Sequence, residues 1–178
     1  TIFIPQLSRA ASFHKPDRLP LWQNNPTPEM IMAQRHFLGY AYTHDVAVWT
    51  DNKPAQQEQD KTFKPAAKFL GGWEKAEFLP YWHPEKQPLS LKCQDARRVI
   101  ASVYAIGNKT VAVVLNDTDS QQPVELKMKH PGEYSAKDAD SKASLDVTSG
   151  EFKDTIPRRD FKVYLIDKKS LIELQDEV

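Results

Sequence analysis

Between residues 28 and 42 the apolar side chains recur at the three- and four-residue spacing of a helix. The apolar positions of this run are Met30, Ile31, Phe37, Leu38 and Ala41. Thr27 is a favourable N-cap, Pro28 suits the first helical position, and Glu29 complements the positive end of the helix dipole. Gly39 interrupts the run, at some cost relative to alanine. The pattern predicts a helix over residues 27–42.

The stretch after this helix predicts a strand, a loop and a short helix. Residues 46–49 form a short apolar run of the buried-strand type, and a helix leading into a buried strand is typical of α/β proteins. Residues 51–61 are polar, which predicts a linker or a long surface loop. Residues 64–70 predict a short helix that starts at Pro65 and is ended by the glycine pair that follows it.

After Trp73 the pattern changes to short apolar runs separated by turn residues. The predicted strands are residues 78–82, 89–93, 99–106, 110–115, 124–128, 133–136, 144–147 and 161–166. Gly107 and Asn108 form a hairpin turn between two strong strands. Many short strands with frequent turns predict an antiparallel β-sandwich. The fold class is therefore mainly β, with a helix-containing segment in front of the sandwich.

These patterns divide the chain into three parts. Residues 1–75 form an N-terminal helical and extended segment, residues 76–167 form the β-sandwich, and residues 168–178 form a charged C-terminal tail. The chain starts with neither an initiator methionine nor a signal-peptide layout, so we expect it to be a piece of a longer one.

Composition excludes several classes of protein. The 24 basic and 24 acidic residues cancel, so no overall field attracts nucleic acid or an anionic membrane. No apolar run approaches the roughly 20 residues that span a bilayer. The single cysteine, Cys93, allows no intrachain disulfide, and we expect it to be a buried, inert thiol. This cysteine content suits a reducing compartment, and equally a secreted or periplasmic bacterial protein.

An aromatic group after the second predicted helix is the first candidate site. Its members are Trp73, Phe78, Tyr81, Trp82 and His83. Exposed rings of this kind bind the C–H faces of sugars, so Trp73, Tyr81 and Trp82 are candidate carbohydrate-binding residues. The alternative is that the rings fill the seam between the helical arm and the β domain. We favour the seam, because large aromatic residues usually anchor cores and interfaces.

Catalytic signals are weak. Asp51 lies just beyond the predicted strand over residues 46–49, where a βα-barrel places its chemistry, and it is a weak catalytic candidate. Glycoside hydrolysis needs two carboxyl groups, and a solvated loop aspartate is the favoured interpretation of Asp51. The five histidines show no zinc-ligand spacing, and no motif predicts a metal or a cofactor.

Two stretches resemble glycoside hydrolases. Residues 35–49 resemble the last helix–strand turn of a glycoside-hydrolase-like TIM barrel. Residues 78–82, 99–104, 111–116 and 134–138 resemble the small β-sandwich that follows such barrels. The resemblance covers residues 27–167 and implies the C-terminal region of a glycoside-hydrolase-like protein. The family's catalytic carboxylates lie in barrel strands that this chain mostly lacks, so none is transferred to it.

The resemblance implies a non-catalytic role, in which the sandwich packs against and stabilises a catalytic barrel. The barrel belongs either to the upstream part of the same chain or to another polypeptide. The alternative is a carbohydrate-binding module that uses Trp73, Tyr81 and Trp82, and a third interpretation is a small enzyme of unrecognised type.

Overall fold

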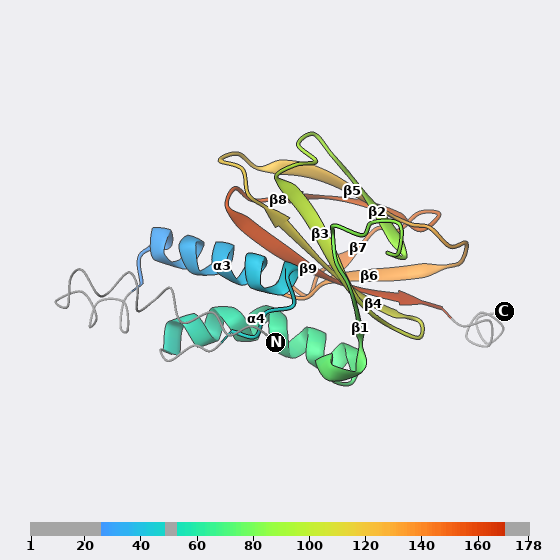
Figure 1. The fold of residues 1–178 in the computed structure, drawn as a ribbon, viewed down its shortest axis with the longest axis horizontal. Coiled ribbons are helices and arrows are strands. Elements are labelled where there is room, and N and C mark those ends of the chain that lie inside the picture. The colour runs from blue at the N-terminus through green and yellow to red at the C-terminus, as the bar shows by residue number, and fades with distance from the viewer. Residues whose placement is uncertain (1–25, 49–52, 170–178) are drawn as a thin grey trace.

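The computed structural model describes residues 26–48 and 53–169 (Figure 1). Its helices are α3 (Pro28–Thr43), α4 (Lys53–Leu70) and the 3-10 helix η2 (Trp73–Lys75). Its strands are β1 (Glu77–Leu79), β2 (Leu89–Cys93), β3 (Val99–Ile106), β4 (Lys109–Asn116), β5 (Gln122–Met128), β6 (Tyr134–Asp138), β7 (Ser144–Leu145), β8 (Glu151–Ile156) and β9 (Asp160–Lys168). No helix within these ranges is both long and apolar enough to cross a membrane.

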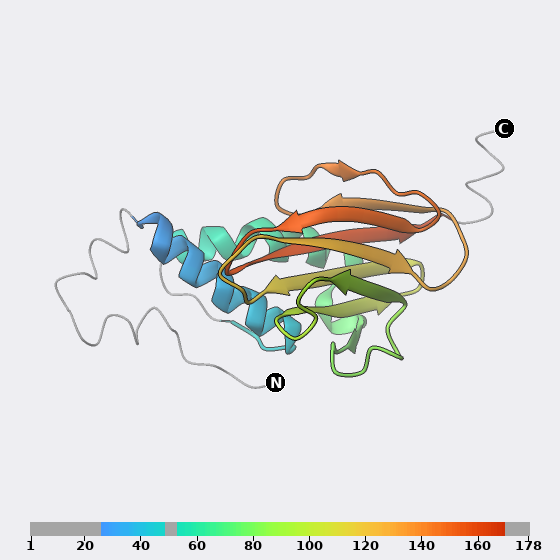
Figure 2. The same cartoon turned by 90° about the horizontal axis from the view of Figure 1, so that it is seen from above.

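The strands form two antiparallel sheets that face each other (Figure 2). The large sheet has six strands in the order β1-β3-β4-β9-β6-β7, and the small sheet has three in the order β2-β5-β8. The predicted antiparallel sandwich preceded by a helical segment is therefore confirmed. The predicted hairpin at Gly107 is also present, because β3 and β4 pair from Val99 with Asn116 to Ile106 with Lys109.

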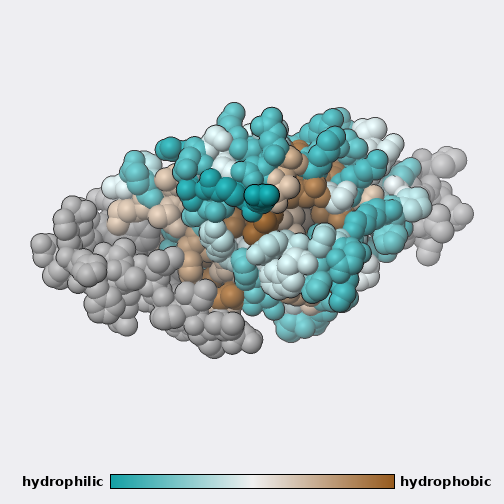
Figure 3. Space-filling model, turned by 45° about the horizontal axis from the view of Figure 1, so that its top comes forward, coloured by the Kyte–Doolittle hydropathy of each residue, from teal (hydrophilic) through white to brown (hydrophobic). Residues whose placement is uncertain are grey.

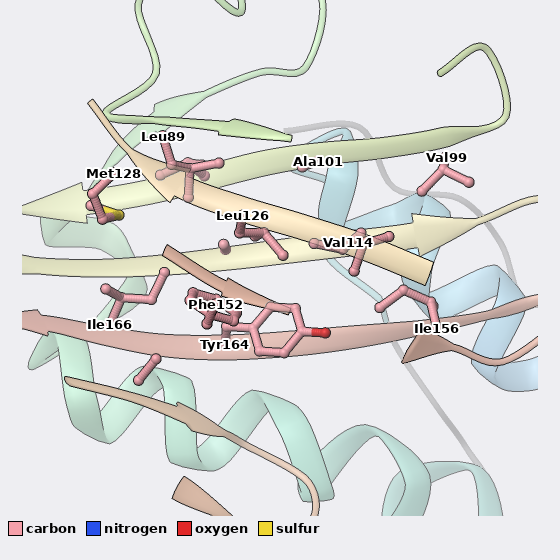
Figure 4. Close-up of a cluster of buried hydrophobic side chains, with 14 of the residues drawn as sticks. Leu89, Val99, Ala101, Val114, Leu126, Met128, Phe152, Ile156, Tyr164 and Ile166 are labelled. Carbon is pink, nitrogen blue, oxygen red and sulfur yellow. The ribbon is translucent and has the colours of Figure 1, made fainter. Parts of the chain in front are cut away.

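One hydrophobic core fills the space between the two sheets (Figure 4). Leu89, Leu126 and Phe152 of the small sheet pack against residues such as Val114 and Tyr164 of the large sheet. Side chains alternate across a strand, so every second residue of each strand reaches this core. Burying these apolar surfaces is the main stabilising contribution to the sandwich.

A second core lies on the other face of the large sheet, where α3 and α4 cover it. Leu38 and Ala66 of these helices pack against Val111, Val113 and Phe161 of the sheet. Strand β4 is therefore buried on both faces from Thr110 onward. The molecule thus has three layers, with helices, large sheet and small sheet in that order.

Gly39 is the point where α3 comes closest to the large sheet. A Cβ atom at this position would lie 2.7 Å from Cδ1 of Leu115 and 2.9 Å from Cβ of Phe161. The helix thus loses some intrinsic stability at Gly39 but gains close packing against the sheet.

The region between α3 and η2 differs from its prediction. Residues 46–48 are irregular rather than a strand, and the backbone N–H of Val46 donates to the carbonyl of Ala41 at 2.8 Å. Helix α4 covers most of the predicted polar loop and continues through Pro65 as one 18-residue helix. The predicted end of the helix at the glycine pair is confirmed. Helix α4 ends at Leu70, and Gly71 has a left-handed φ of 76°.

Two strand predictions also need correction. The first strand ends at Leu79, and Tyr81 and Trp82 lie in the turn that follows, because Pro80 has no N–H for the sheet ladder. Strand β8 was missed. Only Phe152 and Ile156 of this strand are buried apolar residues, and the inward position between them is Asp154.

Candidate functional site

The structure separates Trp73 from the other two candidate carbohydrate-binding residues. Trp73 lies between the helices and the large sheet, stacked on Phe63 at 5.3 Å between ring centroids. It also meets the ring of Tyr104 edge-on at 4.4 Å. Its indole nitrogen is buried, without a hydrogen-bond partner among the residues that the structure describes. Trp73 thus occupies a packing position in the helix–sheet layer.

Tyr81 and Trp82 lie together on the loop after β1, at the C-terminal end of α3. Their rings meet edge-on at 5.0 Å, and both contact the ring of His44, at 5.4 Å from Tyr81 and 5.7 Å from Trp82. Trp82 is 49% exposed. These side chains therefore present aromatic surface to solvent.

The aromatic surface continues along α3. The ring of His44 lies 6.1 Å from that of Tyr40, which in turn lies 5.1 Å from that of His36. His36 and Tyr40 are four residues apart on one face of α3, and His44 is the C-cap residue at the end of that helix, so the three rings follow one another. Tyr40 and Trp82 are the large hydrophobic side chains that are exposed within the described ranges. We call His36, Tyr40, His44, Tyr81 and Trp82 the aromatic row.

Hydrogen bonds hold the centre of the row in place. Nδ1 of His44 lies 2.8 Å from the carbonyl of Tyr40. A carbonyl only accepts, so this nitrogen carries the proton, and Nε2 accepts from the Tyr81 hydroxyl at 3.4 Å. The N–H of Tyr81 donates to the hydroxyl of buried Ser102, which donates to the carbonyl of Thr43. Ser102 thus joins the loop to the end of α3.

A charged cluster lies at the His36 end of the row. The carboxylate of Asp117 accepts from Nε2 of His36 at 2.9 Å and from Arg159 at 2.7 Å. Arg98 also lies beside this carboxylate, and Arg159 bonds Asp119 as well, at 2.9 Å. The two arginines are thus paired with two aspartates, and His36 is a further basic group in contact with Asp117.

The pKa of Asp117 lies below its usual value. Burial acts to raise this pKa, but hydrogen bonds from Tyr40 and His36 and the positive charges of His36 and Arg159 outweigh burial. A carboxyl group with a lowered pKa stabilises the folded state above the pKa of the unfolded chain. That stability is lost as the pH falls through the folded-state pKa.

We therefore expect Asp117→Asn to flatten the acid limb of the stability curve. Wild type should lose more stability than the variant between about pH 5 and pH 2, measured by urea unfolding. Asp146→Asn, a change of an exposed aspartate, is the matched control. Parallel acid limbs for wild type and Asp117→Asn would contradict the expectation.

The chain is similar in fold to several solved structures, whereas comparisons of its sequence find no match. No protein-family model and no curated protein matches it. An α-amylase from Geobacillus thermoleovorans, complexed with acarbose, is 12% identical with a TM-score of 0.53, and the match covers 79% of this chain and 34% of the amylase. The fold of this chain is therefore similar to that of part of this α-amylase.

Two further hydrolases match with lower TM-scores. A GH30 endoxylanase from Clostridium papyrosolvens is 16% identical with a TM-score of 0.44, over 80% of this chain and 39% of the xylanase. A noncanonic maltogenic α-amylase from Thermotoga neapolitana is 11% identical with a TM-score of 0.49, over 92% of this chain and 49% of that one. This chain thus spans less than half the length of each hydrolase.

Three carboxylates surround Arg35 and form a cluster that the sequence did not predict. The guanidinium of Arg35 lies 2.8 Å from Asp160, 2.8 Å from Asp140 and 3.5 Å from Glu58, and it donates to the carbonyl of Phe161 at 3.2 Å. Burial raises the pKa of Asp160, against the effect of Arg35. Because Arg35 bridges these carboxylates, the cluster joins α3, α4 and the large sheet. No signal in the sequence pairs residues so far apart.

The remaining candidates lie elsewhere. Asp51 falls outside the described residues. Within them, no group of three or more His, Cys, Asp or Glu side chains is arranged to hold a metal ion. A shallow groove of about 550 Å³ runs beside the small sheet, where Glu125 lies 3.5 Å from both Lys92 and Lys153. In the view of Figure 3, hydrophilic side chains cover much of the surface, and hydrophobic ones are exposed between them near its centre.

Proposed function

We propose that this chain is a non-catalytic β-sandwich region of a glycoside-hydrolase-like protein that packs against and stabilises a catalytic barrel. The observation that carries the proposal is the extent of the amylase match. It takes in 79% of this chain but only 34% of the amylase. This supports the proposal, because a region of a larger hydrolase would match only a part of the amylase in this way.

The packing of the layers around the large sheet supports a stabilising role. Among the residues that the structure describes, both faces of the large sheet are covered, one by the small sheet and the other by α3 and α4. A rigid body of this kind can support a neighbouring domain through its outer surface. The partner in this proposal is a barrel encoded upstream of Thr1 or carried by another polypeptide.

The charged groups of the interior have structural partners. Arg35 binds Asp140 and Asp160, and Lys162 binds Asp154 at 2.7 Å between the two sheets. Glycosidases hold two carboxyl groups on either side of an accessible scissile bond. The carboxylates around Arg35 and Lys162 instead form ion pairs with these two side chains, and the ion pairs join one layer to the next.

The proposal predicts two results that can be measured separately. The isolated chain should not hydrolyse aryl glycosides above background.

Where the gene encodes a barrel upstream of Thr1, the full protein should have a higher melting temperature than a version that lacks residues 26–169. Adding the separately produced chain back should restore part of the difference, because binding to the folded state stabilises it.

Two outcomes would overturn the proposal. The first is turnover by the isolated chain that Asp51→Asn abolishes, which would reveal a catalytic site here. The second is a barrel with the same melting temperature and activity with and without residues 26–169.

A further inference from the structure

We propose that the charged cluster around Arg35 is a pH-sensitive link, which holds α3 and α4 against the large sheet more tightly after it takes up one proton below neutral pH. This Arg35 cluster consists of Arg35, Glu58, Lys61, Asp140 and Asp160. The proposal goes beyond the stabilising role given above and does not depend on it.

The Arg35 cluster lies where the helices meet the large sheet (Figure 1). Arg35 belongs to α3 and Glu58 belongs to α4. Asp160 is the first residue of β9, and Asp140 lies in the loop that follows β6. The side chains of Arg35, Glu58 and Asp160 are only 13%, 12% and 17% exposed. Because solvent screens partly buried charges weakly, a change of charge here acts directly on the contact between helices and sheet.

Negative groups outnumber positive ones in this cluster. Three carboxylates surround the guanidinium of Arg35, and Lys61 is the second cation, which pairs with Glu58. With every group ionised, the cluster holds three negative and two positive charges. Like charges in a buried site oppose each other, and a single proton makes the cluster neutral.

Asp160 is the carboxyl group that is best placed to take this proton. Its Oδ1 accepts from Nε of Arg35 at 2.8 Å and from the N–H of Phe161 at 2.7 Å. A proton can therefore add to Oδ2 without breaking either hydrogen bond. Burial raises the pKa of Asp160, and the charge of Asp140 raises it further, against the opposing effects of Arg35 and Phe161. The pKa of Asp160 thus lies above its usual value.

The other charged groups around Asp160 have partners outside the cluster. These pairs are Lys162 with Asp154 and Asp138, Arg159 with Asp117 and Asp119, and His36 with Asp117. Arg158 is exposed to solvent, and the residue of β4 that lies opposite Asp160 is the neutral Asn116. The titration of Asp160 is therefore governed mainly by the other members of the Arg35 cluster.

The direction of the pH dependence follows from proton linkage. Because the pKa of Asp160 is raised in the folded state, the folded chain binds this proton at a higher pH than the unfolded chain does. The resulting stabilisation is fully present below the unfolded pKa of about 3.9, and it is lost as the pH rises through the folded pKa. The lowered pKa of Asp117 has the opposite effect on stability.

Urea unfolding at a series of pH values tests the proposal. Asp160→Asn keeps an oxygen that accepts both hydrogen bonds but takes up no proton in this range. As the pH falls from 7.5 to 4, the unfolding midpoint of wild type should rise relative to that of the variant by roughly 0.5 M urea. Asp117 is present in both proteins, so its effect cancels. Asp146→Asn, which changes an exposed aspartate, is the matched control and should keep a nearly constant difference from wild type.

Two further measurements on the folded chain locate the effect. Carboxyl carbon NMR of the wild-type chain should show Asp160 titrating above the usual value of about 3.9. Hydrogen exchange, corrected for its intrinsic pH dependence, should show protection in α3 and α4 rising more than in β2, β5 and β8 between pH 7.5 and 5. Asp140→Asn removes a neighbouring negative charge, so it should bring the pKa of Asp160 closer to the usual value.

Three outcomes would overturn the proposal. The first is a wild-type midpoint that does not rise relative to that of Asp160→Asn as the pH falls. The second is a pKa of Asp160 at or below the usual value, which the NMR titration detects in wild type even where a variant does not fold. The third is an equal change of protection in the helices and in the small sheet, which would show that the proton does not act on the contact between layers.

Discussion

Replacing Arg35 with leucine is expected to destabilise the chain by about 3 kcal/mol, because it leaves three partly buried carboxylates without their positively charged partner. The Arg35 side chain is 13% exposed and lies 2.8 Å from both Asp140 and Asp160. Burial opposes the charged form of Arg35, yet the neighbouring carboxylates raise its pKa. The guanidinium also lies 5.1 Å from the centre of the Phe161 ring, so packing is lost with the charge.

Equilibrium unfolding in urea measures this loss, with the change appearing in the midpoint rather than the slope. Arg159→Leu is the matched control, because Arg159 also binds two aspartates but does so at the surface. Surface ion pairs contribute little, so the control should lose much less stability than Arg35→Leu. Equal unfolding midpoints for wild type and Arg35→Leu would show that the cluster does not join the layers.

The second large effect is expected at Trp73. Trp73→Ala removes a ring that packs on Phe63 and Tyr104 between the helices and the sheet. Truncation of a large aromatic residue in a core costs about 3–5 kcal/mol, and we expect the lower end because part of Trp73 is exposed. A loss of about 3 kcal/mol is a substantial share of the roughly 5–15 kcal/mol that stabilises a typical domain.

Trp82→Ala is the natural comparison, because it removes the same ring from a half-exposed position. We expect a loss below about 1 kcal/mol, since substitutions at the surface usually have small effects. Urea unfolding of the two variants side by side distinguishes the packing ring from the exposed one. Equal losses would mean that Trp73 and Trp82 share one structural role, and the aromatic row would then be part of the fold rather than a surface.

Local patterns determined most of the β-sandwich. Strands β2 and β3 have the predicted bounds, because their apolar residues and flanking turns lie within a few positions of each other. Helix α3 was equally readable, since Thr27 caps it by accepting from the N–H of Met30. Signals of this kind depend on near neighbours in the chain and need no knowledge of the fold.

Helix α4 shows where local patterns are insufficient. Its buried positions include Ala55, Glu58, Thr62 and Ala66, which have helical spacing but are small or polar. Glu58 is buried because Arg35 of α3 reaches it, at 3.5 Å. A polar residue in a buried position is recognisable only with its partner, and that partner is 23 residues away in the chain.

The candidate site divides in the same way. The sequence by itself places His36 and Tyr40 four residues apart on a helix that it predicts correctly, with His44 just beyond the end of that helix, and it singles out Tyr81 and Trp82. Tertiary structure alone decides that the turn after Pro80 brings Tyr81 and Trp82 against His44, and that Trp73 packs inside. The reason is physical, because periodicity reports which face of an element a residue occupies. Which faces meet depends on how the three layers pack, and this is set by contacts between residues far apart in the chain.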